Sequence, residues 1–491
     1  MRNFKSTRGS NIELTGTQAI IKGLAEDKGL FVPTEIPTLP VTLEEMKGKT
    51  YQEIAKLIIG EFFDDYTDEE MLGCIEGAYD SKFEAEEVVP VVKAGDAYFL
   101  ELYHGKTAAF KDMALSILPY LLTTAMKKEK EEKKICILTA TSGDTGKAAL
   151  EGFADVEGTE IVVFFPEDGV SQVQKQQMVT QEGENTHVFA IRGNFDDAQT
   201  GVKKIFNNDE FAKELAAKGV KLSSANSINI GRLVPQVAYY VYSYVKLLEE
   251  GAIKMGDPVN VVVPTGNFGN ILAAYYAKQM GVPFAKFICA SNENKVLTDF
   301  IKTGVYDIRR DFYLTNSPSM DILISSNLER LLYHLSGCKG EVVKELMEKL
   351  ENEKVYEVSD DIKSALCEFY GGYADMKETN ATIGKMYKEE NYLMDTHTAV
   401  AYNVYEQYRK ETGDETVTVI ASTASAYKFA ESVAESIGLP KEANGFECVK
   451  ALNKATDIRI PKGLRDLDKK EVRHREVIDK DKMLEAVEKS L

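Results

Sequence analysis

The feature that most constrains the fold is a repeated pattern in which a short, mostly apolar strand runs into a glycine-containing loop and then a helix. The clearest instance is Val259–Val263 (VNVVV), which enters the loop 264–270 (PTGNFGN) and continues as a helical pattern over Ile271–Met280. A second instance joins the apolar run Lys134–Thr139 to the loop 141–146 (TSGDTG). Buried strands that alternate with helices are typical of parallel sheets. The sequence therefore predicts an α/β fold of mostly parallel sheets flanked by helices.

The chain is too long for a single hydrophobic core. Its 491 residues exceed the roughly 250–300 at which chains divide into domains. We expect an N-terminal region over 1–95, a small domain over 96–235 and a large domain over 236–491, with a helical insertion at about 300–390 of the last.

Charge and composition limit the partners. A net charge of −19 makes nucleic acid and anionic membranes unfavourable partners, so an anionic small-molecule substrate would depend on local donors. No apolar run approaches the ~18 residues of a spanning helix, and the start (MRNFKSTRGS) lacks the apolar segment of a signal peptide. We expect a cytoplasmic protein. Scattered cysteines and histidines predict neither disulfides nor a metal site.

Lys111 is the main catalytic candidate. It follows Phe110 and precedes an apolar helical run that includes Met113, Ile117 and Leu121. An ammonium at such a junction loses solvation, and desolvation favours the neutral amine that attacks aldehydes. Considered alone, a lysine beside an apolar helix more often extends its head group to water. The loops elsewhere in the chain decide between these interpretations.

The loop 264–270 has the features of a phosphate site. It ends a strand and opens a helix, so backbone amides and the positive end of the helix dipole face a ligand. Gly266 and Gly269 allow close approach of the backbone. The same residues also suit a simple tight turn. The full GxGxxG fingerprint is absent from this loop, which argues against a nucleotide-dependent oxidoreductase.

Two other loops offer anion donors. In TSGDTG, Thr141 and Ser142 supply hydroxyls suited to a carboxylate, while Asp144 is either part of the site or only a helix cap. In the loop 226–232 (NSINIGR), Arg232 adds a guanidinium fork to amide and hydroxyl groups, a set that matches a phosphate ester. Each loop alone also has a purely structural interpretation.

In combination, the motifs resemble the threonine synthase family, in its longer bacterial and fungal type. That family lies within the fold type II, tryptophan-synthase-β-like enzymes that use pyridoxal 5′-phosphate. The resemblance spans nearly the whole chain. The motifs, in chain order, are STRG (6–9), GLFVP (29–33), HGKTAAFKD (104–112), SGDTG (142–146), NSINIGR (226–232), PTGNFGN (264–270), SPSMDILISSNLERLL (317–332), DTHTAV (395–400) and ASTASAYKF (421–429).

The resemblance implies how the cofactor is held. Lys111 matches the lysine that forms the Schiff base, and Thr423 matches the hydroxyl residue that faces the pyridine nitrogen. The residues that match the loop around the cofactor phosphate are Gly266, Asn267, Phe268, Gly269 and Asn270.

The resemblance also implies a substrate site. The loop expected to gather the substrate carboxylate and part of its phosphate matches Thr141, Ser142, Asp144 and Thr145. The residues expected around the substrate phosphate are Asn226, Ser227 and Arg232.

Two positions depart from the family pattern. Lys106 stands where proline is usual, and Ser425–Ala426 stand in place of His-Pro. Lys106 either adds positive charge near the substrate phosphate or points to water, and we favour water. Neither replaced residue is expected to carry chemistry.

The implied activity is that of a pyridoxal-phosphate-dependent carbon–oxygen lyase of threonine biosynthesis. It would convert O-phospho-L-homoserine and water to L-threonine and phosphate by γ-elimination and β-hydration. A phospholyase or dehydratase of the same fold would release a 2-oxo acid instead, and the motifs do not separate the two. The intact Lys111, glycine loops and Thr423 argue against a member retained only for binding.

Overall fold

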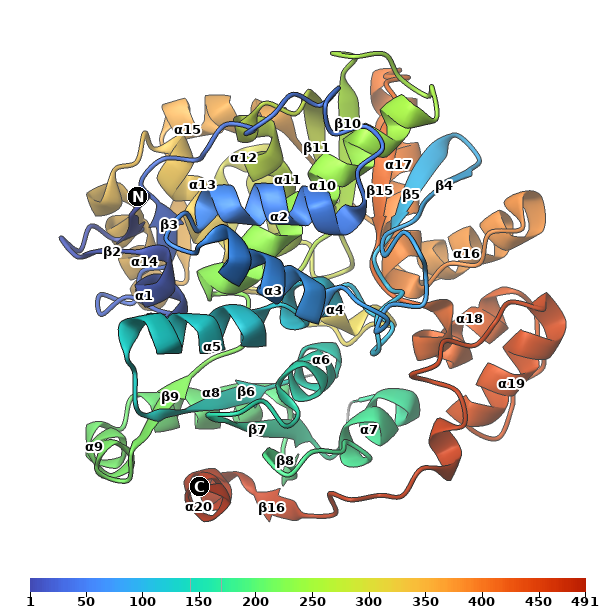
Figure 1. Ribbon diagram of the computed structural model, residues 1–491. Helices are drawn as coiled ribbons and strands as arrows, with labels where there is room; N and C mark the ends of the chain where they lie inside the picture. Colours follow the sequence, from blue (N-terminus) through green and yellow to red (C-terminus); the bar gives the residue numbers. More distant parts are fainter. Residues whose placement is uncertain (142, 169) are drawn as a thin grey trace.

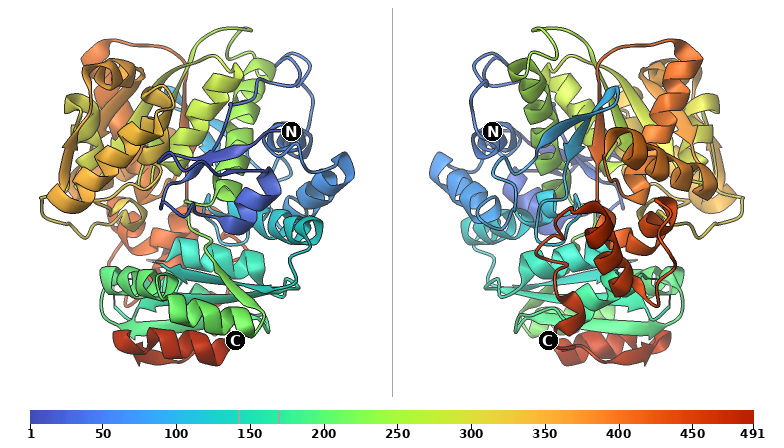
Figure 2. Two further views of the ribbon diagram at one scale, coloured as in Figure 1. Left: turned by 90° about the vertical axis from the view of Figure 1, so that its left-hand side faces the viewer. Right: turned by 90° about the vertical axis from the view of Figure 1, so that its right-hand side faces the viewer.

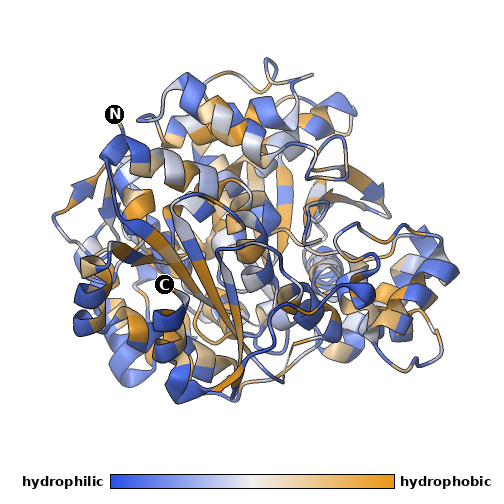
Figure 3. Ribbon diagram, turned by 60° about the horizontal axis from the view of Figure 1, so that its bottom comes forward, coloured by the Kyte–Doolittle hydropathy of each residue, from blue (hydrophilic) through white to orange (hydrophobic). Residues whose placement is uncertain are grey.

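The computed structural model describes residues 1–141, 143–168 and 170–491 and arranges them around two main sheets (Figure 1). Both are mostly parallel and flanked by helices, which confirms the predicted fold class. Apolar residues concentrate in the strands and on the inner faces of the helices, while outer faces are polar (Figure 3). Among the described residues, every helix is too short or too polar to span a bilayer.

The N-terminal region is a layer of helices with a small antiparallel sheet. The strands β1 (Phe4–Ser6), β2 (Glu13–Leu14) and β3 (Phe31–Pro33) pair in the order β2-β1-β3. A capping box at Thr15, Thr50 or Thr67 starts each helix, and these reciprocal bonds satisfy amides that a helix start leaves free. The helices are α1 (Gly16–Lys22), α2 (Tyr51–Phe62) and α3 (Asp68–Ala78).

The large sheet has the strand order β14-β11-β10-β15-β5-β4, in which only β4 and β5 pair antiparallel. Its strands are β4 (Val91–Ala94), β5 (Ala97–Glu101), β10 (Val259–Pro264), β11 (Phe284–Ser291), β14 (Phe369–Tyr373) and β15 (Thr418–Ser422).

Helices cover both faces of the large sheet, which explains its β-branched strands. Val261 and Val263 share a core with α10 (Ile230–Glu249) and α11 (Gly269–Met280). Val262, between them, points to the opposite face and packs with α17 (Thr396–Thr412). A strand buried on both faces carries apolar residues in succession rather than in alternation.

The small sheet is parallel throughout, in the order β16-β8-β7-β6-β9. Its strands are β6 (Lys134–Ala140), β7 (Thr159–Pro166), β8 (Thr186–Arg192), β9 (Val220–Ser223) and β16 (Val477–Asp479). The helices around it are α5 (Leu118–Glu129), α6 (Asp144–Phe153), α7 (Gln172–Val179), α8 (Phe195–Phe206), α9 (Asp209–Ala217) and α20 (Met483–Ser490). Figure 2 shows this sheet and α20 below the rest of the molecule in both views.

Strand pairing crosses the domain boundaries that the sequence led us to expect. β5 lies within 96–235 yet pairs with β15 of the large sheet. β16 lies within 236–491 yet adds an edge strand to the small sheet beside β8. The polar composition of the chain after Pro440 gives little sign of this strand, because edge strands are short and often charged. The division at 95 and 235 remains a proposal.

The remaining elements complete the outer layers. The strands β12 (Val305–Asp307) and β13 (Val355–Glu357) form an antiparallel pair within the helical insertion. The other helices are α4 (Asp112–Leu115), α12 (Val296–Thr303), α13 (Leu328–Leu335), α14 (Gly340–Glu353), α15 (Asp360–Ala365), α16 (Met376–Glu390), α18 (Ala430–Ser436) and α19 (Gly445–Thr456).

Candidate active site

Lys111 lies immediately before α4, where its side chain is only 11% exposed. Its Nζ is 3.5 Å from Ser319 Oγ and 3.9 Å from Asp144 Oδ2. Burial lowers the pKa of Lys111 to about 8, and the charges of Arg232 and Lys428 act in the same direction while Asp144 opposes them. The neutral amine is therefore accessible near physiological pH.

The loop before Lys111 is hydrogen-bonded to the residues that follow β15. Phe110 N donates to Thr423 O at 2.7 Å, and an antiparallel bridge joins Ala109 to Ala424. Thr423 N in turn donates to Thr398 Oγ1 at 3.3 Å. These bonds leave the Thr423 hydroxyl with no hydrogen bond among the described residues, beside the lysine loop and available to a ligand.

The loop 141–146 is held by its own first residue. Thr141 Oγ1 accepts from Gly143 N and Gly146 N, each at 2.9 Å. Gly143 adopts φ 141°, and a Cβ there would lie 2.6 Å from the Gln174 side chain, so only glycine fits. Of the other predicted residues, Thr145 is half-buried, and Ser142 lies outside the described residues.

Asp144 opens α6, but its carboxylate does not cap the helix. Oδ1 accepts from Lys428 Nζ at 2.7 Å and from Gln174 Nε2 at 2.9 Å, and Oδ2 faces Lys111. Although burial opposes ionisation, the Lys428 and Lys111 ammonium groups hold the pKa of Asp144 well below its usual range. Asp144 therefore lies among the groups around Lys111 instead of acting as a helix cap, and its part in substrate binding remains a proposal.

The loop 264–270 presents unused donors. It leads from β10 to α11 through Phe268, whose φ of 62° is strained for a residue other than glycine. None of the amides of 266–270 donates to another described residue. A Cβ on Gly266 would lie 2.5 Å from Ser319 O, so close packing against that carbonyl requires glycine. The amides and the start of α11 together suit a phosphate.

Two buried side chains, Asn270 of this loop and Arg232 of α10, each carry a donor without a hydrogen-bond partner among the described residues. Asn270 Oδ1 accepts from the hydroxyls of Tyr239 and Tyr240, and Asn270 Nδ2 has no partner. Arg232 is 3% exposed; its Nη1 donates to Ala225 O at 2.8 Å, while its Nε has no partner. Burial lowers the pKa of Arg232 to about 10. Because unpaired buried donors are costly, this set fits bound anions.

Of the other two residues predicted around the substrate phosphate, Ser227 has a side chain that is hydrogen-bonded within the described structure and Asn226 does not. Ser227 Oγ accepts at 3.1 Å from Asn327 Nδ2, which also donates to Asn267 O at 2.9 Å. Ser227 therefore contacts Asn327, the residue that holds the loop 264–270 at Asn267. The Asn226 side chain makes no hydrogen bond among the described residues and is half-buried.

Sequence reasoning missed several residues of the site. His397 Nδ1 is 2.7 Å from Asp395 Oδ2, and its Nε2 accepts from Ser319 N at 3.1 Å. Gln174 lies on α7, where no sequence signal marks it. The others stand within motifs already quoted for the resemblance, and these are Ser319, Asn327, His397 and Lys428.

Lys106 has a role that neither expectation described. Its Nζ is 2.9 Å from Glu151 Oε1, and Lys147 Nζ lies 3.0 Å from the other carboxylate oxygen. The Lys106 side chain is 48% exposed. It is therefore a partly exposed partner of an acid on α6.

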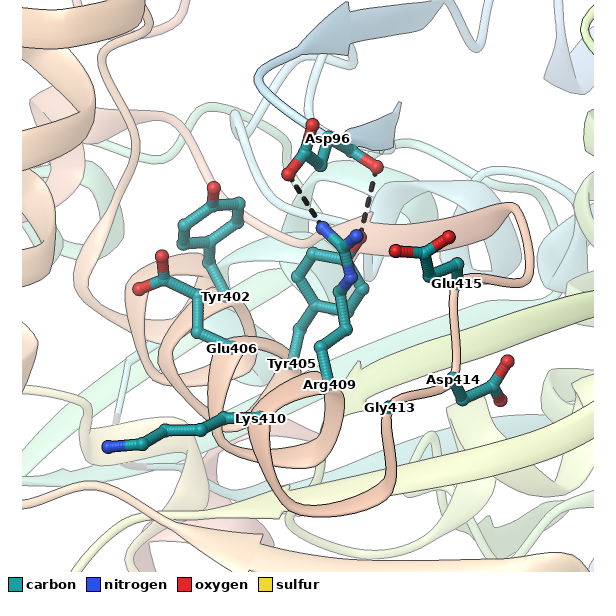
Figure 4. A pocket seen from close by; sticks show the side chains of 9 residues that line it. All are labelled: Asp96, Tyr402, Tyr405, Glu406, Arg409, Lys410, Gly413, Asp414 and Glu415. Atoms are coloured by element: carbon teal, nitrogen blue, oxygen red, sulfur yellow. Dashed lines mark hydrogen bonds and ion pairs between the residues drawn. The ribbon is translucent and has the colours of Figure 1, made fainter.

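A surface hollow beside the C-terminal end of α17 is separate from this site (Figure 4). Arg409 spans it and pairs with Asp96 at 2.6 Å. At 1.5 Å per residue, Arg409 lies roughly 18 Å along the helix from His397. The hollow therefore contributes nothing to the groups around Lys111.

Comparisons with known families match nearly the whole length of the chain. Residues 3–79 match the model of the threonine synthase N terminus, residues 90–423 that of pyridoxal-phosphate dependent enzymes, and residues 398–490 that of the threonine synthase C-terminal region.

Individual relatives give the same result. Threonine synthase from Eremothecium gossypii is 36% identical over 467 residues, covering 88% of this chain and 89% of its own. Human threonine synthase-like 1 is 41% identical over 441 residues, but the chain spans only 58% of that longer relative. The crystal structure of pyridoxal-phosphate-bound threonine synthase from Brucella melitensis matches with a TM-score of 0.88 at 34% identity, covering 100% of this chain and 98% of that one.

Proposed function

Because the chain belongs to the threonine synthase family of pyridoxal-phosphate-dependent carbon–oxygen lyases, we propose that it converts O-phospho-L-homoserine and water to L-threonine and inorganic phosphate. Family membership confirms the predicted resemblance, fold class and cofactor. The particular substrate and product are the proposal. A cytoplasmic location, with no nucleic-acid or membrane partner, is proposed with them on the strength of the chain's composition.

The observation that carries the proposal is one buried amine surrounded by unused anion donors. Arg232 and Lys428 are buried cations close to the Lys111 amine, and Asp144 is the ionised acid among them. This local excess of positive charge stands against a net charge of −19 for the whole chain. Such an arrangement supports a dianionic substrate that general electrostatics would otherwise repel.

The described residues fit pyridoxal phosphate. The free amides of 266–270 and Asn270 Nδ2 would hold its phosphate, the Thr423 hydroxyl would face its ring nitrogen, and Lys111 would hold its aldehyde group. When bound, the cofactor supplies an electron sink for negative charge at the substrate carbons.

The chain's own groups supply binding and proton transfer. With a pKa of about 8, the Lys111 amine is suited to take and return protons at Cα and Cβ of the substrate. Arg232 would bind the substrate phosphate through its free donors. The loop 141–146 would receive the substrate carboxylate, and the Lys428 charge offsets the repulsion that Asp144 would otherwise exert.

The same groups also suit the alternative reaction. The human relative that matches at 41% is named threonine synthase-like, whereas the fungal relative that matches at 36% is named threonine synthase. A phospholyase or dehydratase would use the same lysine and donors and release a 2-oxo acid. The two reactions differ in whether water adds at Cβ, so the product distinguishes them.

The test is the product formed from O-phosphohomoserine by the purified protein with added pyridoxal phosphate. We expect phosphate and threonine in equal amounts, measured by a colorimetric phosphate assay and by amino-acid chromatography. Unphosphorylated homoserine is the matched control and should release little threonine. Predominant 2-oxobutanoate would instead establish the alternative reaction.

A further inference from the structure

Lys428 is a second buried lysine beside the proposed catalytic one. It lies in a short 3-10 helix, Ala426–Phe429, and its side chain is fully buried. Its Nζ is 2.9 Å from Thr107 O and 2.7 Å from Asp144 Oδ1. A buried ammonium is costly unless it is paired. The contacts with Thr107 O and Asp144 Oδ1 offset this cost, and the ion pair with Asp144 connects Lys428 to the site.

One carboxylate lies between the two lysines. Asp144 Oδ1 faces Lys428, and Asp144 Oδ2 lies 3.9 Å from Lys111 Nζ. Gln174 Nε2 donates to Oδ1 at 2.9 Å, and Ser319 Oγ lies 3.5 Å from Oδ2. The short contact is to Lys428, so the charge of Asp144 is largely compensated on the side away from Lys111.

This compensation has a consequence for Lys111. The charged groups that face Lys111 are Asp144 from α6, Arg232 from α10, Lys428 from the 3-10 helix and its neighbour Asp112 from α4. A carboxylate whose only cation was Lys111 would favour the ammonium form of that lysine. The ammonium form neither attacks an aldehyde nor accepts a proton.

We propose that Lys428 is a positioning residue that holds Asp144 in an ion pair on the side away from Lys111 and so keeps the Lys111 amine available in its neutral form. The inference rests on the proposed assignment of Lys111 as the lysine that holds the cofactor. In this arrangement, Asp144 orients the two lysines, and Lys428 sets how strongly Asp144 attracts the reactive one.

The experiment measures the neutral fraction of Lys111 without using turnover. The full-length protein, freed of cofactor, is mixed with pyridoxal phosphate, and the rate at which visible absorption develops is followed across pH. The variants are Lys428→Met, Asp144→Asn, Lys428→Arg and the double variant that combines the first two. Borohydride reduction and peptide mass mapping then identify which lysine carries the cofactor.

The two single variants should move the apparent pKa of the reaction in opposite directions. Removing Lys428 frees Asp144 to attract Lys111, so this pKa should rise by about 1 or more. At pH 7, the rate should then fall about tenfold. Above the pH, each further unit of pKa lowers the fraction of Lys111 in the neutral form about tenfold. Asp144→Asn should lower the pKa, Lys428→Arg should stay near wild type, and the double variant should lie between the single ones.

Each outcome distinguishes the inference from its premise. If the reduced adduct maps to a lysine other than Lys111, the proposed cofactor assignment fails. If it maps to Lys111 but Lys428→Met leaves the pKa unchanged or lowers it, the inference about Lys428 fails. Should Lys428→Met not fold, a double variant whose pKa is as low as that of Asp144→Asn would overturn the proposal, because removing Lys428 would then leave the pKa of Lys111 unchanged.

Discussion

The loops 264–270 and 141–146 both lie near Lys111, the first through Ser319 and the second through Asp144. Each leads from a parallel strand into a helix, but they are held in different ways. The first is braced from outside, where Asn327 Nδ2 donates to Asn267 O at 2.9 Å and Ser325 Oγ donates to Gly266 O at 2.7 Å. The second is braced from within by Thr141 Oγ1. Only the second carries an ionised acid, Asp144.

The outer bracing of the first loop extends to the N-terminal region. Arg330 is fully buried; it donates to Asn327 Oδ1 and, through Nε, to Phe31 O at 2.9 Å. Beside it on α13, Glu329 pairs with Arg8 at 2.8 Å. The N-terminal motifs STRG and GLFVP therefore contact the site through α13, although they supply no group to the chemistry.

The difference between the loops matches two kinds of ligand. Donors fixed by several distant segments are preorganised, so a phosphate that remains bound through many turnovers gains most from them. The loop 141–146 is held by one internal hydroxyl and, from outside, by one ion pair and one side-chain hydrogen bond, all at Thr141 and Asp144. Such a loop suits a ligand that is exchanged at every turnover. The comparison supports the proposed assignment of the cofactor to 264–270 and of the substrate to 141–146.

The largest expected effect comes from Lys111, the lysine near both loops. Lys111→Ala should abolish the visible cofactor band and reduce activity by more than the ~10²–10⁴ that acid–base catalysis alone contributes. Lys106→Ala is the matched control, because a partly exposed ion pair is worth about 0–1 kcal/mol and should leave activity close to wild type. Absorption spectra and a phosphate-release assay measure both. A band that survives in the first variant would contradict the assignment.

A smaller loss should follow from Arg232, and it separates substrate from cofactor. A desolvated guanidinium–phosphate contact is worth about 2–5 kcal/mol. Since ~1.4 kcal/mol is a factor of ten, Arg232→Leu should lower kcat/KM for O-phosphohomoserine by roughly thirty-fold to several-thousand-fold. The cofactor band should persist, and slow side reactions of unphosphorylated amino acids should change much less. Loss of the band with normal substrate binding would place Arg232 at the cofactor or in the fold.

The smallest effect tests the outer bracing itself. Asn327→Ala removes the amide that joins Ser227 to Asn267, and a lost buried hydrogen bond costs about 1–3 kcal/mol. At ~1.4 kcal/mol per tenfold, the affinity for pyridoxal phosphate should fall roughly 5- to 150-fold in a titration of visible absorption. Asn226→Ala, whose side chain makes no such bond, should leave that affinity unchanged. Equal losses in the two variants would show that the loop is not braced in this way.

The sequence by itself determined the fold class and supplied most of the residues proposed for the site. Successive β-branched residues at 259–263 require cover on both faces, and glycines at strand–helix turns mark where ligands approach, because both are local properties of the chain. The order of the motifs was sufficient to identify the family. Lys111, the loop 264–270 and Thr423 lie near one another in the structure, and their roles toward the cofactor remain a proposal.

Only the tertiary structure decided which groups act on one another. No local feature of the sequence around Asp144 separates a helix cap from a site residue. Its ion-pair partner, Lys428, stands 284 residues later in the chain. The pairing of β16 with β8 and the hydrogen bond from Arg330 to Phe31 O likewise join segments that are far apart in the chain. No local pattern in either segment predicts these contacts. Burial sets the pKa of Lys111 and the pairing of Asp144, and burial is a property of the packed chain rather than of any segment within it.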